Sequence, residues 1–503
     1  MKLSYLLIVL SLLFPAHIFA HDLPDLGDVS QATITPRQER EIGLQIMREI
    51  RGDPSYLDDP EVASYLNHLG YKLISNSSES SPGQSFEFFA LQDPSINAFA
   101  LPGGFMGFNS GLIIAAQNES ELAGVMAHEI AHVTQKHLAR MIAGQKYSLL
   151  TSLASLAIAI LASRANPQAG GAILAASQAG AVQKQLDFTR KHEEEADRVG
   201  LNILLDAGFD PQGMSSFFKR LQEAGRFRDD SAPSYLRTHP ITYERIADIQ
   251  NRTQKMTYRQ VQDSMGFLLI RAKLRALQGK PEDAVKQFKT RLQEQRYASE
   301  VIERYGFVYA LLRDKKYKQA EKELALLYRT LHTDATFATL RNHQLGKTIR
   351  VEHRNIQSEA MFETLAAKVK LAANETTQAL NIYRAALNIY PQHRALIYDY
   401  TTALLQNQKV DAALKFINQQ LQILRNDVRL YKLQAQSYAA LGDDMLKHRA
   451  QAEVYIQQGL YTAAVDQLKI ALKNDNGDFY QLSSVEARLK QVKIMAQELE
   501  DQE

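Results

Sequence analysis

Two histidines four positions apart, with a glutamate between them, form the clearest chemical pattern in the chain. The segment reads His128-Glu129-Ile130-Ala131-His132. On a helix, residues i and i+4 share a face, so both imidazoles can reach one metal ion. Glu129 can then accept a proton from a water held by that metal. The pattern predicts metal-assisted hydrolysis, although so short a pattern also occurs by chance.

A third metal ligand can come from an acidic segment further along, residues 192–197, which reads HEEEAD. Glu193 and Asp197 are also i and i+4, so one carboxylate can reach the metal while the other accepts an imidazole N–H behind it. Two histidines and one glutamate leave a position open for water, as in catalytic rather than structural zinc sites. The alternative is a solvated acidic helix face. His137 and His192 lack ligand spacing and are expected not to bind the metal.

The composition narrows the chemistry that remains. The 503 residues include no cysteine, which excludes disulfides, zinc ribbons, iron–sulfur clusters and thiol catalysis. Any metal must therefore bind to His, Asp or Glu. A net charge of +2 gives no reason to expect nucleic acid or an anionic membrane as a partner. A chain of this length is expected to form two or three domains.

The chain starts like an exported protein. Lys2 is followed by an apolar run from Leu6 to Phe14 and then by Ala20, the pattern of a signal peptide at residues 1–20. An uncleaved anchor is the alternative, but the run is shorter than the ~20 residues of a membrane span, and Pro15 follows it. The lack of cysteine excludes N-terminal lipid attachment. Export without disulfides suits a bacterial periplasm.

The catalytic motif needs a helix, and the sequence supplies one. Asn118 and Glu121 form a capping box for a helix that is expected to run to about Ala143. Upstream, the patterns predict helices from Thr35 to Ile50 and from Pro60 to Ile74, a strand from Phe86 to Leu91, and two short strands between Asn97 and Asn109 around a Pro-Gly-Gly turn.

Downstream of the motif, residues 149–161 are the most apolar run of the mature chain. Their length favours a buried or substrate-facing helix over a membrane span, and contact with a membrane stays open. A helix is then expected to pass through Glu193 to about Ala207, and another from Met214 to Ala224.

From about Ser264 the pattern is wholly helical and has the period of tetratricopeptide repeats. Ala379 and Ala413 lie about 34 positions apart, which is one such period. A small residue is needed there because the two helices of a repeat approach closely. Similar anchors are Ala284, Ala320 and Ala464. An irregular helical bundle is the alternative, and residues 331–358 fit the repeat poorly, as an insertion would.

The HExxH motif followed by Glu193-x-x-Ala196-Asp197 resembles the metallopeptidases related to HtpX and to the CAAX prenyl proteases. With a signal peptide in place of membrane helices and a tetratricopeptide tail, the chain is most similar to the periplasmic β-barrel assembly-enhancing proteases of that family. The resemblance implies that His128, His132 and Glu193 are the zinc ligands. It also implies that Glu129 is the catalytic base and that Asp197 is a carboxylate behind the ligands.

The resemblance extends to three further features. Asn97-Ala98-Phe99 is similar to the family's edge strand, to which substrate adds as another strand. His239, in Thr238-His239-Pro240, matches a histidine that in this subgroup can take the fourth zinc position and restrain activity. Arg245 stands at the matching downstream arginine. A plain surface histidine is the alternative for His239.

The expected fold class is mainly α with a small β element. An α+β zincin-like metallopeptidase domain is predicted at residues 21–255, and an α-solenoid of tetratricopeptide-like repeats at residues 264–503.

The resemblance implies a periplasmic endopeptidase with one Zn²⁺ per chain and a chaperone role in outer-membrane protein assembly. Its substrates would be misfolded or stalled β-barrel proteins, including the lipopolysaccharide translocon, and its partner the barrel assembly machinery. Peripheral proximity to the membrane is compatible with this, and no nucleic acid is expected. The alternative function is a chaperone or adaptor whose repeats bind that machinery and whose zinc site is mostly latent.

Overall fold

The computed structural model of this chain describes residues 35–77, 84–143, 190–226, 234–254, 256, 260–333, 356–473 and 478–500. The predicted signal peptide (1–20), the apolar run 149–161 and most of the expected insertion (334–355) lie outside the described residues.

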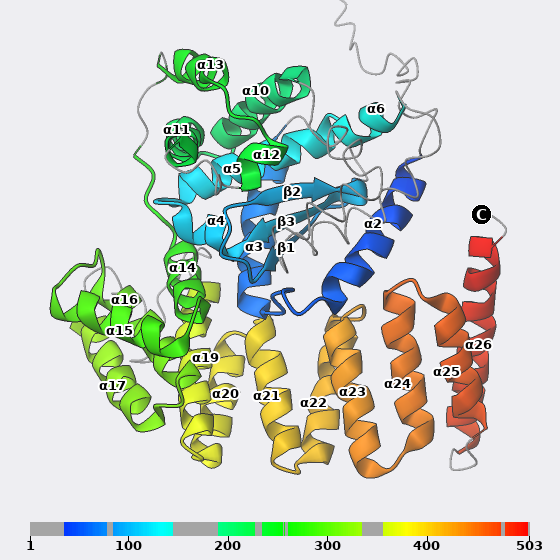
Figure 1. Cartoon of the computed structure of the whole chain (residues 1–503). Coiled ribbons are helices and arrows are strands. Elements are labelled where there is room, and N and C mark those ends of the chain that lie inside the picture. Colours follow the sequence, from blue (N-terminus) through cyan, green and yellow to red (C-terminus); the bar gives the residue numbers. More distant parts are fainter. Residues whose placement is uncertain are drawn as a thin grey trace, which may run out of the picture.

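The N-terminal part contains one small sheet and a set of helices around it (Figure 1). Its elements are α2 (Pro36–Gly52), α3 (Pro60–Ser75), β1 (Glu87–Leu91), β2 (Ala98–Leu101), the 3-10 turn η1 (Pro102–Gly104), β3 (Phe105–Asn109), α4 (Ser110–Ala115), α5 (Glu119–Thr134), α6 (His137–Ala143), α10 (Arg190–Asp206), α11 (Gln212–Arg226), α12 (Ser234–Thr238) and α13 (Tyr243–Thr253).

The repeat part is entirely helical within the described residues. Its helices are α14 (Met265–Leu277), α15 (Pro281–Gln293), α16 (Glu300–Arg313), α17 (Tyr317–Thr333), α19 (Ile356–Ala372), α20 (Thr376–Ile389), α21 (Arg394–Gln406), α22 (Val410–Ile423), α23 (Val428–Leu441), α24 (Asp444–Gln457), α25 (Tyr461–Leu472) and α26 (Phe479–Glu500).

The three strands lie in the order β1-β3-β2. β1 runs parallel to β3, and β2 pairs antiparallel with the other side of β3, so β2 is an edge strand. The expected Pro-Gly-Gly turn joins β2 to β3. Gly103 and Gly104 both have a positive φ there, and a Cβ on Gly104 would lie 2.1 Å from the carbonyl oxygen of Ser85. Only glycine fits such a close backbone approach.

The helix that carries HExxH is shorter than expected. α5 ends at Thr134, and α6 starts at His137, instead of one helix reaching Ala143. Lys136 between them has φ 52°, a left-handed conformation that ends an α-helix. The sequence prediction of a single helix was therefore wrong.

Only one of the two hydrogen bonds expected of the capping box at the start of α5 forms. The Asn118 side chain accepts a hydrogen bond from the backbone N–H of Glu121, as expected. The Glu121 carboxylate does not return to Asn118. It pairs with the guanidinium of Arg220 and accepts from the backbone N–H of Gln117 at 2.7 Å, because a buried carboxylate is stabilised best by a cation.

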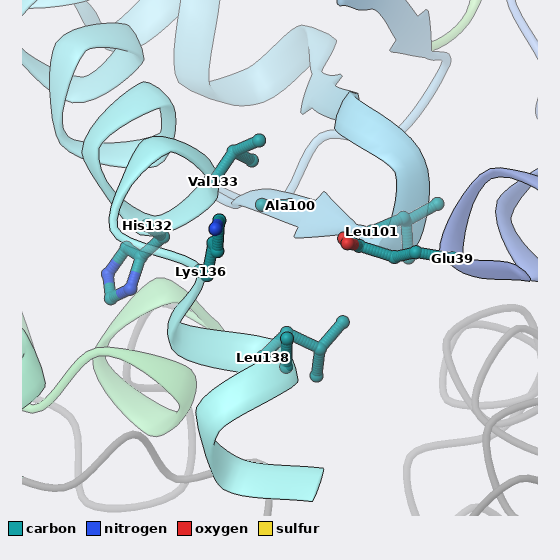
Figure 2. A pocket seen from close by; sticks show the side chains of 8 residues that line it. Glu39, Ala100, Leu101, His132, Val133, Lys136 and Leu138 are labelled. Carbon is teal, nitrogen blue, oxygen red and sulfur yellow. The ribbon is translucent and has the colours of Figure 1, made fainter. Parts of the chain in front are cut away.

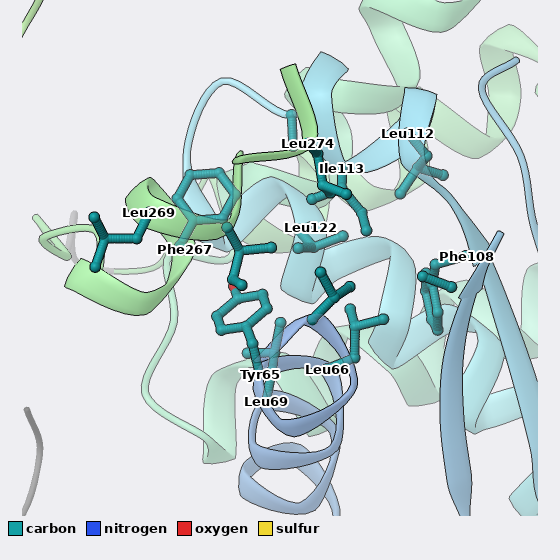
Figure 3. Packing of buried hydrophobic residues seen from close by; sticks show 14 of the residues in the cluster. Tyr65, Leu66, Leu69, Phe108, Leu112, Ile113, Leu122, Phe267, Leu269 and Leu274 are labelled. Carbon is teal, nitrogen blue, oxygen red and sulfur yellow. The ribbon is translucent and has the colours of Figure 1, made fainter. Parts of the chain in front are cut away.

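One apolar core crosses the predicted domain boundary. Figure 3 shows Tyr65 and Leu66 of α3 beside Leu122 of α5 and Phe267 and Leu269 of α14, and all of them belong to a single buried cluster. That cluster continues through α16, α17 and α19. The boundary between residues 255 and 264 stays a prediction, and the first repeat helices share their core with the N-terminal part.

α14 also caps the start of the HExxH helix. Ser264 donates to the Glu119 carboxylate from Oγ (2.6 Å) and from its backbone N–H (3.0 Å). The Asp263 carboxylate accepts from the backbone N–H of Glu119 at 2.7 Å, and Arg271 donates to the carbonyl of Ala116 at 2.8 Å. The first turns of α5 and α14 therefore satisfy each other's free N–H groups.

A second polar contact ties the repeats to the first turn of α3. Lys273 of α14 is buried, and its Nζ lies 2.5 Å from Asp59 and 2.6 Å from Glu61. Further along the repeats, Arg429 pairs with Asp58 at 3.2 Å. The buried Lys273 contact and the shared apolar core hold the first repeat helices against the N-terminal part, and Arg429 marks a second, exposed contact of the row of repeat helices that lies beneath that part in Figure 1.

The repeat anchors are buried as the pattern requires. Ala379, Ala413, Ala320 and Ala464 are fully buried, and Ala284 is nearly so. Each sits where neighbouring helices approach, so a larger side chain would not fit. The expected fold class is confirmed, a mainly helical chain with one small sheet followed by helical repeats.

Candidate active site

Four buried side chains converge on one point between α5, α10 and the residue after α12. They are His128, His132, Glu193 and His239, and their potential ligand atoms all lie within 4.8 Å of one another. His128 Nε2 is 3.0 Å from His132 Nε2 and 3.4 Å from His239 Nδ1. Glu193 Oε1 lies 3.1 Å from His239 Nδ1 and 3.5 Å from His132 Nε2.

Local sequence explains how these groups meet. His128 and His132 lie one turn apart on α5, so their rings leave the same face. α10 crosses α5 closely because Gly200 has no side chain; a Cβ there would lie 3.0 Å from the backbone nitrogen of His128. This approach brings Glu193, in the first turn of α10, to the imidazoles.

The donor set fits a tetrahedral zinc ion. Zinc–nitrogen and zinc–oxygen bonds of about 2.0–2.1 Å imply ligand-to-ligand distances of about 3.3 Å in a tetrahedron. Four of the distances between these atoms, 3.0 to 3.5 Å, bracket that value, and no two of the four ligand atoms are more than 4.8 Å apart. Three imidazoles and a carboxylate are also a donor set that zinc favours.

Ionised groups behind the ligands complete the site. His128 Nδ1 lies 3.0 Å from Asp197 Oδ1, and Arg245 contacts both Asp197 and Glu193. Burial would raise the pKa of Asp197, but Arg245 outweighs it and lowers that pKa. Burial would also raise the pKa of Glu193, which His239 and His128 lower instead. Both carboxylates are therefore anions at neutral pH.

The two HExxH histidines differ in charge. Burial would lower the pKa of His128, but hydrogen bonds to Asp197 and Glu193 raise it to about 9. Burial lowers the pKa of His132. The two carboxylates therefore favour positive charge at this point, which also suits a bound cation.

Glu129 lies beside this group, fully buried. Neither of its carboxylate oxygens accepts a hydrogen bond from any residue that the structure describes. His239 Nε2 is 3.5 Å from Glu129 Oε1. A buried carboxylate without donors is costly unless a water or substrate meets it, so this arrangement suits a catalytic base.

Sequence reasoning missed Tyr235, which lies against the same group. Its ring stacks on His239 with centroids 4.7 Å apart and meets His128 at 6.5 Å. It is fully buried, and its hydroxyl has no hydrogen-bond partner among the described residues. Burial, followed by the charge of Glu129, raises its pKa well above the ordinary value. Its spacing of four residues before His239 was the available signal.

The unpaired side of β2 faces away from β3. The backbone N–H of Asn109 donates to the carbonyl of Asn97 at 3.0 Å, so pairing toward β3 falls on Asn97, Phe99 and every second residue. The peptide groups of Ala98 and Ala100 therefore point to the unpaired side. The Phe99 side chain is buried against Phe89, with ring centroids 6.0 Å apart.

Both ends of this unpaired edge are closed. At one end, the backbone N–H of Tyr235 donates to the carbonyl of Ile96 at 3.1 Å. At the other, Arg40 of α2 donates to the carbonyl of Gly103 at 2.6 Å, and Glu39 accepts from the Gly103 N–H at 3.1 Å. Ala98 is fully buried, so Ala100 is the only residue of β2 that is partly exposed on this side.

A small hollow opens between β2 and the α5–α6 junction, directly beside His132 (Figure 2). Its walls are mostly apolar, with one acidic and one basic side chain among them. The lining residues are Glu39, Ala100, Leu101, His132, Val133, Lys136, Leu138 and Ala139.

His137 and His192, expected to be non-ligands, lie outside the metal-binding group. They are nevertheless close to it. His137 Nδ1 is 2.8 Å from His132 Nδ1, and His192 stacks on the His137 ring with centroids 4.5 Å apart. The break between α5 and α6 brings His137 back onto His132, and that break was not predicted.

The motif on a buried helix, its two histidines, the glutamate from α10 and the adjacent carboxylate define a metallopeptidase site. The profile of "Peptidase family M48" matches residues 60–253, and a tetratricopeptide-repeat profile matches residues 370–437. Within the described residues no helix has the length and apolar character needed to span a membrane.

Similarity to known proteins extends along almost the whole chain. The "Beta-barrel assembly-enhancing protease" of Escherichia coli K12 is 31% identical over 480 residues, 94% of this chain and 92% of that protein. The "Putative beta-barrel assembly-enhancing protease" of Vibrio cholerae is 40% identical over half of this chain and 52% of its own. The "Mitochondrial metalloendopeptidase OMA1" of Arabidopsis thaliana is 30% identical over 36% of this chain and 35% of its own. The chain therefore belongs to the M48 metallopeptidases and is a homologue of the β-barrel assembly-enhancing proteases.

Proposed function

We propose that this protein is a periplasmic zinc endopeptidase that degrades misfolded or stalled outer-membrane β-barrel proteins. The observation that carries the proposal is a buried metal-binding group next to Glu129, whose carboxylate oxygens accept no hydrogen bond from the described residues. Near full-length similarity to proteins named for β-barrel assembly supports the substrate class. The signal-peptide pattern of residues 1–20 supports the periplasm.

The proposed roles follow from position. His128, His132 and Glu193 hold zinc, which when bound polarises the peptide carbonyl and acidifies a water. Glu129 takes a proton from the attacking water and passes it to the leaving amine. Asp197 lies 3.0 Å from His128 Nδ1 and would fix the orientation of that ring, and Arg245 keeps Asp197 ionised.

The substrate strand is proposed to add to β2 along Asn97, Ala98 and Phe99. The peptide group of Ala100, the partly exposed residue of this edge, would offer hydrogen bonds that depend on no particular substrate side chain, and a strand would reach the fully buried Ala98 only after a local movement. The hollow beside His132 would receive one substrate side chain next to the bond that is cut.

His239 is proposed as a fourth ligand that keeps the resting enzyme latent. Its Nδ1 lies among the other ligand atoms, where a substrate or water would otherwise bind. The peptidase unit (21–255) would become active when this side chain withdraws. The repeat unit (264–503) would dock on the barrel assembly machinery and hold clients such as the lipopolysaccharide translocon, which adds a chaperone role.

The filled fourth position also favours a second function. The protein would then act as a chaperone or adaptor through its repeats, with the zinc site silent in most conditions. Hydrolysis of casein and of an unfolded β-barrel protein by purified protein separates the two functions. Wild type and His239→Ala should cleave both, and Glu129→Gln should retain one zinc per chain and cleave neither, because an amide accepts no proton. If zinc-loaded wild type and zinc-loaded His239→Ala both lack hydrolytic activity, the peptidase function is wrong and the chaperone function remains.

A further inference from the structure

His132 contacts other residues through both of its ring nitrogens. Nε2 faces the metal-binding group, 3.0 Å from His128 Nε2. Nδ1 faces the other way and lies 2.8 Å from His137 Nδ1. His137 Nε2 is in turn 3.1 Å from Glu195 Oε2, which accepts from Arg140 Nη2 at 2.6 Å. His132, His137, Glu195 and Arg140 thus form a continuous chain of contacts.

The direction of each hydrogen bond follows from the metal. Nε2 of His132 must offer a lone pair to a cation, so the ring proton is on Nδ1 and is donated to His137 Nδ1. A neutral imidazole has one N–H, so the proton of His137 is on Nε2 and is donated to Glu195. Both tautomers are therefore set by the carboxylate at the far end.

We propose that His137 and Glu195 are positioning residues of the metal site, which fix the tautomer and ring orientation of His132. Without the carboxylate, His137 could carry its proton on Nδ1, and two N–H groups would then face each other. His132 would have to rotate or place its own proton on Nε2, where it blocks the cation. The inference rests on the proposed zinc site and concerns a different contact from the one between His128 and Asp197.

The burial of the residues around His137 supports a positioning role for it. His137 is fully buried although it carries a polar ring, and it reaches His132 only because the chain turns at Lys136, with φ 52°. The side chain of Glu195 is 28% exposed, and that of Arg140 is 34% exposed. The carboxylate end of the chain is thus partly solvated, which lowers the cost of keeping it charged.

Two neighbouring glutamates provide a matched pair of variants. Glu195→Gln removes the charge at the end of the chain while its amide oxygen still accepts a hydrogen bond. Glu194→Gln makes the same change one position earlier, on a side chain that is 54% exposed and pairs with Arg190. The measurement is the rate of zinc loss from the full-length protein to a chromophoric chelator, without any assay of hydrolysis.

The expected result is zinc loss at least about tenfold faster in Glu195→Gln, faster still in His137→Ala, and unchanged in Glu194→Gln. His137→Asn should recover part of the loss, because its side-chain carbonyl can accept the Nδ1–H of His132. Cobalt-loaded Glu195→Gln should also show a shifted visible absorption band, which a change in general stability would not produce.

Wild-type rates of zinc loss in both Glu195→Gln and His137→Ala would overturn the inference. Equal acceleration in Glu194→Gln would overturn it as well, since any loss of negative charge on α10 would then suffice. A wild-type protein that binds no zinc would overturn the proposed function together with this inference. Thermal unfolding of each zinc-free variant checks that the proteins compared are folded.

Discussion

The guanidinium group of Arg245 donates hydrogen bonds to the Asp197 carboxylate from two of its nitrogens. Nε lies 2.7 Å from Asp197 Oδ2 and Nη2 lies 2.8 Å from Oδ1, while the third nitrogen, Nη1, is 2.8 Å from Glu193 Oε2. All three side chains are buried. One cation therefore contacts two carboxylates of the metal site. Burial would lower the pKa of Arg245, but Asp197 and then Glu193 outweigh it and raise that pKa.

Arg245→Met should destabilise the zinc-free protein by about 3–5 kcal/mol, because Asp197 and Glu193 remain buried without their cation. Zinc should recover part of this loss, since it places positive charge beside Glu193. The free energy of unfolding, measured with zinc and with a chelator, checks both statements. Arg252→Met is the control, because that side chain is 43% exposed in its pair with Asp248 and should cost at most about 1 kcal/mol. Equal costs for the two variants would contradict the prediction.

His239→Ala should hydrolyse casein about tenfold faster than wild type or more, because it opens the fourth position at the metal. The same change combined with Glu129→Gln should be inactive, which shows that the gained activity belongs to this site. Initial rates at equal zinc content are the measurement. A slower His239→Ala would mean that the imidazole assists the reaction, and the latch would be wrong.

Tyr235→Phe should stabilise the protein by about 1 kcal/mol, because it removes a buried hydroxyl that has no partner among the described residues. Tyr398→Phe is the matched comparison. That hydroxyl donates to Asp427 at 2.6 Å, so its removal should cost about 1–3 kcal/mol. Chemical denaturation measures the free energy of unfolding of both variants, which should rise in Tyr235→Phe and fall in Tyr398→Phe. A loss of stability in Tyr235→Phe would show that its hydroxyl has a partner after all.

Lys273→Met should cost about 3–5 kcal/mol at neutral pH, because Asp59 and Glu61 lose the ammonium group between them. Lys370, whose side chain is 26% exposed and pairs with Glu321 and Glu375, is the control, and Lys370→Met should cost at most about 1 kcal/mol. Because the two parts share a core, we expect the N-terminal part and the repeats of Lys273→Met to unfold together when its free energy of unfolding is measured.

The cost of Lys273→Met should shrink in acid. Burial would raise the pKa of Asp59, but Lys273 lowers it below 3.8, so the wild type keeps this stabilisation until the pH falls through that lowered value. Lys273 itself has a raised pKa, and its contribution persists until the pH rises through that value, above 10.5. The stabilities of wild type and variant should therefore converge as the pH falls below 3.8, and curves that stay parallel there would contradict this.

Much of the fold could be predicted because local rules were sufficient. The Asn118 cap, the Pro-Gly-Gly turn and the recurrence of small residues at Ala379 and Ala413 depend on near neighbours or on a fixed period. The same holds for the spacing of His128 and His132, which a single helix turn determines. The role of Arg245 came from resemblance alone.

What could not be predicted depends on distant partners. The helix of the motif ends because Lys136 takes a left-handed conformation that its residue type does not signal. The Glu121 carboxylate pairs with Arg220 of α11 instead of completing the predicted capping box. The contact between His137 and His132, and the burial of Tyr235 beside His239, arise only after these elements have packed.

The short open edge of β2 has a consequence for which proteins can be cut. If a client adds to β2 as proposed, Ile96 and Gly103 are already occupied by Tyr235 and by α2, and Ala98 is fully buried, so the client must present a strand with free peptide groups to Ala100. A finished β-barrel is closed on itself and has no such strand, whereas a half-built barrel still has two open edges. The enzyme would thus sort its clients by the completeness of their hydrogen-bonding and not by their sequence, and a barrel that has closed would be immune to it.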